Sequence, residues 1–187
     1  LKAKMWRQKL GYNQNDIVLL FAGKFETKKQ PDMLADAVLV TNKNRRQKLH
    51  LLLIGNGPLE NELKKKYGNE SHIQFLPFQN QSQMPLVYRL GDVFCLPSKG
   101  PGETWGLAIN EAMASKKPVI ASNKVGCARD LVKEKQGWIF PYNDAKVLIK
   151  ILKSIEKTSL NQKGVQAQKF IKEWNFEKIV NAIKNNL

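Results

Sequence analysis

The sequence predicts an α/β fold: a doubly wound parallel sheet of about six strands, with helices on both faces and further helices at the C-terminal end. Two observations lead to this expectation. Short, continuous apolar runs recur along the chain, and between them apolar residues fall at helical spacing. Strands that are apolar at every position are typical of sheets buried on both faces, and their alternation with helices favours parallel pairing.

The expected strands are six short apolar runs, each ending near polar or turn-forming residues: 17–22, 51–54, 73–76, 93–96, 118–121 and 137–140. Because crossovers between parallel strands are right-handed, the order should be doubly wound.

Helical patterns separate these runs. Apolar residues fall at helical spacing over 31–38 and again over 59–63, after the first two strands. Beyond about Asp144 the strands stop, and two amphipathic helices are expected, over 145–155 and over 176–187.

Length and composition indicate one ordinary globular domain over residues 1–187. No apolar run is long enough to cross a bilayer, and the N-terminal residues do not form a signal peptide pattern. The two cysteines give no disulfide framework, and Cys95 lies within an apolar run where burial is expected. These features favour a reducing, cytoplasmic setting.

The net charge of +15 is compatible with several partners: nucleic acid, an anionic membrane face or a phosphorylated substrate. The lysines are scattered, however, and the longest run, 64–66, falls on an expected helix, where charge usually means a solvated face. The charge therefore does not choose between a functional surface and a solvated one.

In a doubly wound sheet, ligands bind beyond the carboxyl ends of the strands, and two glycine-containing loops leave the first two strands there. The loop over 23–30 carries Lys24, Lys28 and Lys29, which could reach a phosphate or form an exposed basic loop. It lacks the Walker pattern. The turn over 55–58 holds two glycines, which allow a close approach to a ligand or a tight turn.

A third loop, over 100–106, precedes a helical pattern that starts near Leu107. Glu103 and Glu111 are eight residues apart, which on one helix would place them about 80° out of register. With Glu103 ahead of the helix and Glu111 within it, they can hold two parts of one ligand, and the helix N-terminus between them suits a diphosphate. Alternatively, Glu111 is a surface carboxylate and Glu103 a first-turn acid.

Taken in order, these motifs resemble the C-terminal, donor-binding domain of the family-four retaining glycosyltransferases of GT-B architecture, which is Rossmann-like. The resemblance covers nearly the whole chain. The segments that carry it are Gly23-Lys24-Phe25 with Lys29-Gln30, Gly55–Pro58, Phe75–Phe78, Asp92–Ser98, the Glu103-x7-Glu111 motif and Glu111–Ala114 with Lys117–Ala121.

The resemblance implies a role for each motif. Glu103 would bind hydroxyls of the donor sugar and Glu111 the ribose hydroxyls, while Lys24 and Lys29 would neutralise the departing diphosphate. The other donor-binding residues that it implies are Gly23, Gly55, Phe78 as a wall for the nucleobase, Thr104, and the backbone of Trp105, Gly106 and Leu107.

The sequence departs from the family pattern at two positions. Lys24 stands where the family has arginine, which keeps the charge without the bidentate geometry. Gln30 replaces the usual glycine, so that either Lys28 or Lys29 could be the functional lysine.

The family transfers sugar with retention, by front-face attack in which the leaving phosphate helps to deprotonate the acceptor. The expected donor substrate is a sugar linked to UDP or GDP, and no metal or further cofactor is expected. His50 and His72 are isolated in the sequence and are expected to be surface or packing residues.

In the family the acceptor, a glycan or a lipid-linked glycan, sits mostly on an N-terminal domain that this chain lacks. We therefore expect the chain to bind donor but to transfer sugar poorly alone. The helix over 176–187 resembles the segment that returns to the first domain, so its apolar stripe should be exposed or repacked. Peripheral attachment to the inner membrane face is a further option.

Two other functions are compatible with parts of the sequence. A nucleic-acid-binding module would explain the charge, but the carboxylates of Glu103 and Glu111 would repel a phosphate backbone and no RNA or DNA motif is present. A non-catalytic sensor of nucleotide sugars on the same fold stays open, as do the base, the sugar and the acceptor.

Overall fold

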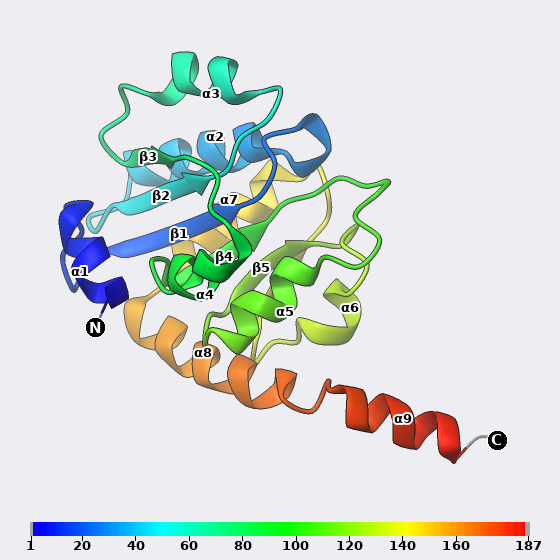
Figure 1. Ribbon diagram of the computed structural model, residues 1–187. Coiled ribbons are helices and arrows are strands. Elements are labelled where there is room, and N and C mark those ends of the chain that lie inside the picture. The colour runs from blue at the N-terminus through cyan, green and yellow to red at the C-terminus, as the bar shows by residue number, and fades with distance from the viewer. Residues whose placement is uncertain (1, 186–187) are drawn as a thin grey trace.

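The computed structural model describes residues 2–185 and contains a six-stranded sheet in the order β3-β2-β1-β4-β5-β6, with every neighbouring pair parallel (Figure 1). The strands are β1 Ile17–Ala22, β2 Leu49–Ile54, β3 Ile73–Leu76, β4 Val93–Leu96, β5 Val119–Ser122 and β6 Gly137–Phe140. The predicted doubly wound sheet is confirmed. The second strand begins two residues earlier than expected, at Leu49.

The order of strands reverses between β1 and β4, the two central strands. β1 pairs with β2 over its full length, from Ile17 opposite Leu49 to Ala22 opposite Ile54. It pairs with β4 only at Leu19 and Leu20. The chain therefore leaves β1 and β4 in opposite directions along the sheet, and this reversal is where doubly wound folds open a crevice at their carboxyl edge.

The helices are α1 Lys2–Lys9, α2 Pro31–Lys43, α3 Glu60–Tyr67, α4 Met84–Tyr88, α5 Leu107–Ala114, α6 Ala128–Leu131, α7 Ala145–Ser154, α8 Lys157–Ile171 and α9 Phe176–Lys184, with 3-10 turns η1 Thr27–Lys29 and η2 Gln81–Gln83.

The core has two halves, one on each face of the sheet, because successive residues of a strand point to opposite faces. Val18 and Leu20 of β1 pack in one cluster with α4, α5 and α6. Leu19 and Phe21 pack in the other with α2, α3 and α7. All four side chains, and that of Cys95, are completely buried, as the continuous apolar runs predicted.

The sequence did not reveal α8, the longest of the described helices. Its buried positions are Leu160, Gly164, Ala167 and Ile171, which do follow helical spacing. Two of the four are glycine and alanine, so the apolar signal is weak. A glycine is needed at position 164, because a Cβ there would lie 2.5 Å from the carbonyl oxygen of Lys116.

The predicted terminal helix is present as α9, which extends away from the body of the molecule in Figure 1. Val180 and Ile183 are exposed, at 45% and 55%, whereas Leu187, the end of the predicted stripe, lies outside the described residues. Within residues 2–185 we find no helix with the length and apolar character required to span a membrane.

Candidate functional site

The loops after β1 and β2 are joined through their backbones at the carboxyl edge. The amide of Gly23 donates to the carbonyl of Ile54 at 2.9 Å, and the amide of Phe25 donates to the carbonyl of Asn56 at 2.7 Å. A Cβ on Gly55, whose φ is +146°, would lie 2.0 Å from the Gly23 carbonyl oxygen. Gly55 therefore permits a close approach between two loops of the protein itself.

The β1–α2 loop brings one of its lysines to Glu103. Nζ of Lys29 lies 2.8 Å from Oε2 of Glu103, and the Ser98 hydroxyl donates to the same oxygen at 3.0 Å. Lys28 instead pairs with Glu26 at 3.4 Å, with 40% of its side chain exposed. The structure thus places Lys29, and not Lys28, beside Glu103.

Gln30 occupies a left-handed backbone conformation, with φ +49° and ψ +48°, at the N-cap of α2. Glycine adopts this conformation without the steric cost that a Cβ introduces. Its side-chain amide donates to Asn143 at 2.7 Å. The geometry explains why a glycine suits this position and shows that the turn forms with glutamine as well.

The segment from Glu103 to Gly106 is fixed by the turn after β5. The amide of Gly126 donates to the Glu103 carbonyl at 3.1 Å, and that of Cys127 to the Trp105 carbonyl at 2.9 Å. A Cβ on Gly126 would lie 1.7 Å from the Thr104 carbonyl oxygen, so only glycine fits. Sequence reasoning missed this support, for which the only signal was a glycine shortly after the fifth strand.

Helix α5 begins at Leu107 as predicted, with Gly106 at its N-cap in a left-handed conformation, φ +92°. The first amides of a helix have no intrahelical partner, which makes this turn suitable for an anion. The Trp105 indole donates to Asn110 at 3.0 Å and packs against Trp174, while the Leu107 side chain is 67% exposed. The Trp105 side chain is thus engaged with Asn110 and Trp174 and does not line either of the two cavities described next.

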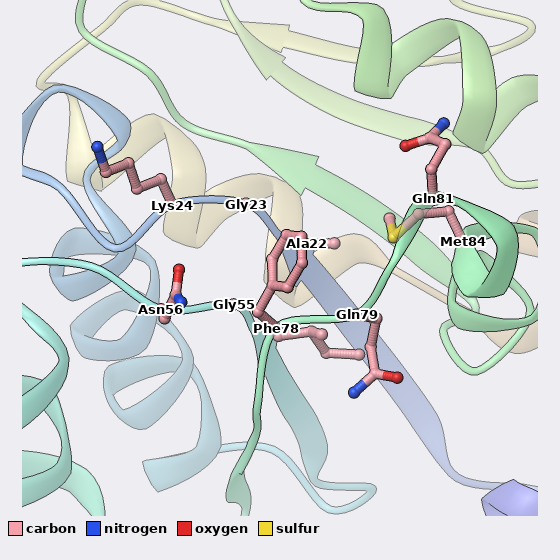
Figure 2. Close-up of a pocket in the computed structure, with 10 residues that line it drawn as sticks. Ala22, Gly23, Lys24, Gly55, Asn56, Phe78, Gln79, Gln81 and Met84 are labelled. Atoms are coloured by element: carbon pink, nitrogen blue, oxygen red, sulfur yellow. The ribbon is translucent and has the colours of Figure 1, made fainter.

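A cavity of about 370 Å³ opens beside these loops, lined by Gly23, Lys24, Gly55 and Phe78 among others. Figure 2 shows the Phe78 ring between the loop of Lys24 on one side and Gln81 and Met84 on the other. Phe78 is 60% exposed, so its ring is accessible from the cavity. Four residues predicted for the site thus line one cavity.

Glu111 lines a second cavity of about 290 Å³, which shares Gln81 and Met84 with the first. Its Oε1 accepts from the Gln81 amide at 2.9 Å, and its Oε2 accepts from the Tyr88 hydroxyl at 2.7 Å. Burial, together with the neighbouring carboxylate, raises the pKa of Tyr88, so this hydroxyl remains a donor. Sequence reasoning missed both Gln81 and Tyr88.

The predicted residues therefore form two groups. Lys29 and Glu103 form one group, and the Phe78 cavity with Glu111 forms the other, with the start of α5 leading from Glu103 toward Glu111.

The two histidines lie elsewhere. His50, at the amino end of the sheet, has its ring centroid 5.2 Å from that of His72, so the two side chains pack against each other, in line with the packing role expected for them. Within the described part of the chain, no three His, Cys, Asp or Glu side chains are grouped as metal ligands would be.

The comparisons with known proteins bear on this geometry. The family model described as glycosyl transferases group 1 matches residues 2–173. D-inositol 3-phosphate glycosyltransferase of Saccharomonospora viridis is 31% identical over 149 residues, 74% of this chain and 34% of that protein. Phosphatidyl-myo-inositol mannosyltransferase of Mycobacterium leprae is 32% identical over 142 residues, 75% of this chain and 37% of that protein. The chain thus spans about a third of the curated relatives it matches.

Solved structures share the fold at lower identity. A sucrose-phosphate synthase from Thermosynechococcus elongatus superposes with a TM-score of 0.78 at 22% identity, covering 96% of this chain and 46% of that one. The C-terminal domain of a glycosyl transferase group 1 family protein from Francisella tularensis gives 0.77 at 21% identity and covers 94% of both chains. The chain therefore belongs to the glycosyl transferases group 1 family and forms a C-terminal-type domain of GT-B architecture.

Proposed function

We propose that the chain binds a nucleotide-diphosphate sugar and, together with an acceptor-binding N-terminal domain, transfers the sugar with retention to a glycan or lipid-linked acceptor. The observation that carries the proposal is the arrangement around α5. The Lys29–Glu103 pair stands before its first turn, and Glu111 stands within it beside the cavity of Phe78. A single nucleotide sugar would then contact both Glu111 and the Lys29–Glu103 pair, with its diphosphate at the start of α5.

Each part of the donor has a matching surface. The base would lie against the exposed Phe78 ring, since aromatic faces stack on nucleobases. The ribose hydroxyls would donate to Glu111, replacing the amide of Gln81. Glu103 would accept hydroxyls of the sugar from its place beside Lys29.

The transfer step needs positive charge at the diphosphate. As the bond from the anomeric carbon to the phosphate oxygen breaks, negative charge grows on the diphosphate, and Lys24, Lys29 and the first amides of α5 would stabilise it. The acceptor oxygen bonds to the same face of the anomeric carbon, and its proton passes to the leaving phosphate. In this mechanism the lysines supply the charge, so we expect transfer without a metal or a further cofactor.

Relatives support the donor class. An Anabaena protein of the same fold is described in complex with UDP and glucose, with a TM-score of 0.77. The sequence relatives carry names of glycosyltransferases and a mannosyltransferase that act on inositol compounds. We expect UDP or GDP as the nucleotide of the donor. From the sequence we also expect a cytoplasmic setting and, for a lipid-linked acceptor, peripheral contact with the inner membrane face.

Calorimetric titration of the chain with UDP, GDP and ADP, in the presence of EDTA, tests the donor site. We expect one diphosphate to bind selectively, and Glu111→Ala to weaken it about tenfold or more, the worth of a hydrogen bond to a charged group. Glu134→Ala, on an exposed turn, is the matched control. Equal binding of all three, unaffected by Glu111→Ala, would contradict the proposal.

Transfer itself requires the longer protein with its N-terminal domain. Transfer of the sugar to an acceptor glycan, with the anomeric configuration of the product read by NMR, is the expected result. Donor binding without transfer or donor hydrolysis would favour the sensor function instead. Tight binding of long nucleic acids with steep salt dependence, and indifference to nucleoside diphosphates, would favour a nucleic-acid module.

A further inference from the structure

A third cavity, of about 420 Å³, is lined by three cationic residues, Arg89, Lys116 and Lys117. It adjoins the cavity of Glu111, with which it shares Arg89 and Ser115. Arg89 and Lys117 shortly precede β4 and β5, which places them at the amino ends of those strands. The cavity lies between α4, α5 and α8, and Figure 1 shows α8 running along the molecule below the other two. We refer to it as the basic cavity.

The cations of the basic cavity have no carboxylate in direct contact among the described residues. The acid that acts on Lys117 is Asp92. Both oxygens of Asp92 are already engaged, because Oδ1 pairs with Lys157 at 2.8 Å and Oδ2 accepts from Val18 at 2.8 Å and Arg7 at 3.2 Å.

The second cavity offers no free acid either. Arg89 lines it together with Glu111. Both Glu111 oxygens accept hydrogen bonds, one from Gln81 and one from Tyr88.

The lysines are not needed as caps for α5, the simplest structural role for cations near a helix C-terminus. The carbonyl oxygens of the last four residues of α5 already have partners: they accept from the amides of Ser115, Lys117 and Lys116 and from the side-chain amide of Gln168, each at 2.9 Å. Helix capping therefore does not account for these side chains.

The environment of Lys117 disfavours its protonated, charged form. Its pKa is lowered to about 8, mainly by burial; Asp92 opposes this shift, and the positive charges of Arg7, Lys157 and Arg89 add to it. A bound anion would remove much of this penalty, because an opposite charge close to an ammonium group favours its protonated form.

We propose that the basic cavity binds a phosphate group, on a ligand other than the nucleotide-sugar donor. Arg89 can offer its planar fork to two phosphate oxygens, and Lys116 and Lys117 can act as point charges. Ser115 and Asn161, which also line the cavity, add neutral polar groups. The three cations line one cavity and do not form an extended basic strip. This arrangement suits a single phosphate group, with room for a small attached moiety. The phosphate belongs to a soluble phosphorylated compound or to a phospholipid headgroup.

The test is a titration of the chain with inorganic phosphate at constant ionic strength, followed by two-dimensional NMR of the backbone amides. We expect saturable shifts at Ser115, Lys116 and Lys117. The double variant Arg89→Gln/Lys117→Gln should weaken the apparent affinity at these amides about tenfold or more, as loss of two charged contacts implies. Lys65→Gln, on the exposed side of α3, is the matched control and should change nothing.

Two outcomes would overturn the proposal. The shifts could be confined to the loops of Gly23 and Gly106 and disappear in Lys29→Gln, in which case phosphate binds at the donor site alone. They could also grow linearly without saturation and survive in the double variant, as a general effect of salt would. Neither outcome bears on donor binding, which is measured separately with nucleoside diphosphates.

Vesicles distinguish the two sources of phosphate. Sedimentation with vesicles of phosphatidylglycerol and phosphatidylcholine, lost in Arg89→Gln/Lys117→Gln but not in Lys65→Gln, identifies a lipid headgroup. Saturable phosphate binding without such sedimentation identifies a soluble phosphorylated ligand. Either result supports a phosphate site in the basic cavity.

Discussion

The hydroxyl of Tyr88, on α4, donates a 2.7 Å hydrogen bond to Oε2 of Glu111, on α5. Tyr88 is 1% exposed and its ring packs on Phe94 of β4, so the hydroxyl is held in place by the core. A buried group therefore orients the Glu111 carboxylate, which we propose binds the ribose. Its other oxygen, Oε1, accepts from Gln81, whose side chain lies at the surface.

Replacing Tyr88 by phenylalanine should weaken binding of the preferred nucleoside diphosphate about tenfold, because Glu111 loses the donor that orients it. The effect should be smaller for the 3′-deoxy nucleotide, which lacks a hydroxyl that Glu111 would accept. Calorimetry with both nucleotides measures this coupling. Tyr67→Phe removes an equivalent 2.7 Å hydrogen bond, to Asp36 on the other face, and should leave both affinities unchanged. Equal losses for the two nucleotides would mean that Tyr88 does not act through the contact of Glu111 with the 3′-hydroxyl.

Lys29→Ala should reduce diphosphate binding and transfer by about ten- to a hundredfold, the worth of one hydrogen bond to a charged group. Its ammonium group lies at Glu103, where the diphosphate and sugar are proposed to meet. Lys28→Ala is the neighbouring control, since Lys28 pairs with Glu26 instead. Titration with UDP and GDP and assays of the longer protein give the two numbers. A larger loss in Lys28→Ala than in Lys29→Ala would show that the assignment is reversed.

Gly55→Ala should unfold at a markedly lower urea concentration, with a loss of about 2 kcal/mol or more in the free energy of unfolding. The new methyl group would meet the Gly23 carbonyl at 2.0 Å, at a φ of +146°. Gly11→Ala is the control, because Gly11 also has a positive φ, +82°, but nothing lies within 4 Å of its Cβ position. The free energy of unfolding of Gly11→Ala should fall only by the roughly 1–2 kcal/mol that a left-handed conformation costs a residue with a Cβ. Equal losses in both variants would show that the loop contact gives no stability.

The pKa of Lys117 predicts a pH dependence of stability. Burial lowers this pKa from 10.5 to about 8, so between these values the unfolded chain binds more protons than the folded one. The free energy of unfolding contributed by Lys117 should therefore rise as the pH rises from about 8 to about 10.5. Lys117→Met removes this contribution. Urea unfolding should show the variant gaining stability over the unchanged chain at pH 7, with the gain shrinking toward pH 10.5. A gain that does not change with pH would contradict the prediction.

The sequence alone was sufficient to predict the sheet, because the central strands β1 and β4 are continuous apolar runs, which indicate burial on both faces, and because helical patterns alternate with the strands. It also predicted that Glu103 precedes α5 and that Glu111 lies within it, since Gly100, Gly102 and Gly106 interrupt the helical pattern before Leu107. Helix α8 escaped notice because its buried face uses Gly164 and Ala167, whose small side chains allow close packing but give little apolar periodicity.

The partners of the candidate site residues depended on contacts between distant segments. The sequence left open whether Lys28 or Lys29 is the functional lysine, and only the turn of η1 directs Lys29 to Glu103, 74 positions away. Other contacts between distant segments were equally hidden in the sequence. Gln81 and Tyr88 donate to Glu111, and Gly126 packs against the backbone of Thr104. Arg89 and Lys117 line the same basic cavity. Burial and period are local properties that a sequence displays directly, whereas the direction of a side chain depends on how the crossovers pack elements that are far apart in the chain.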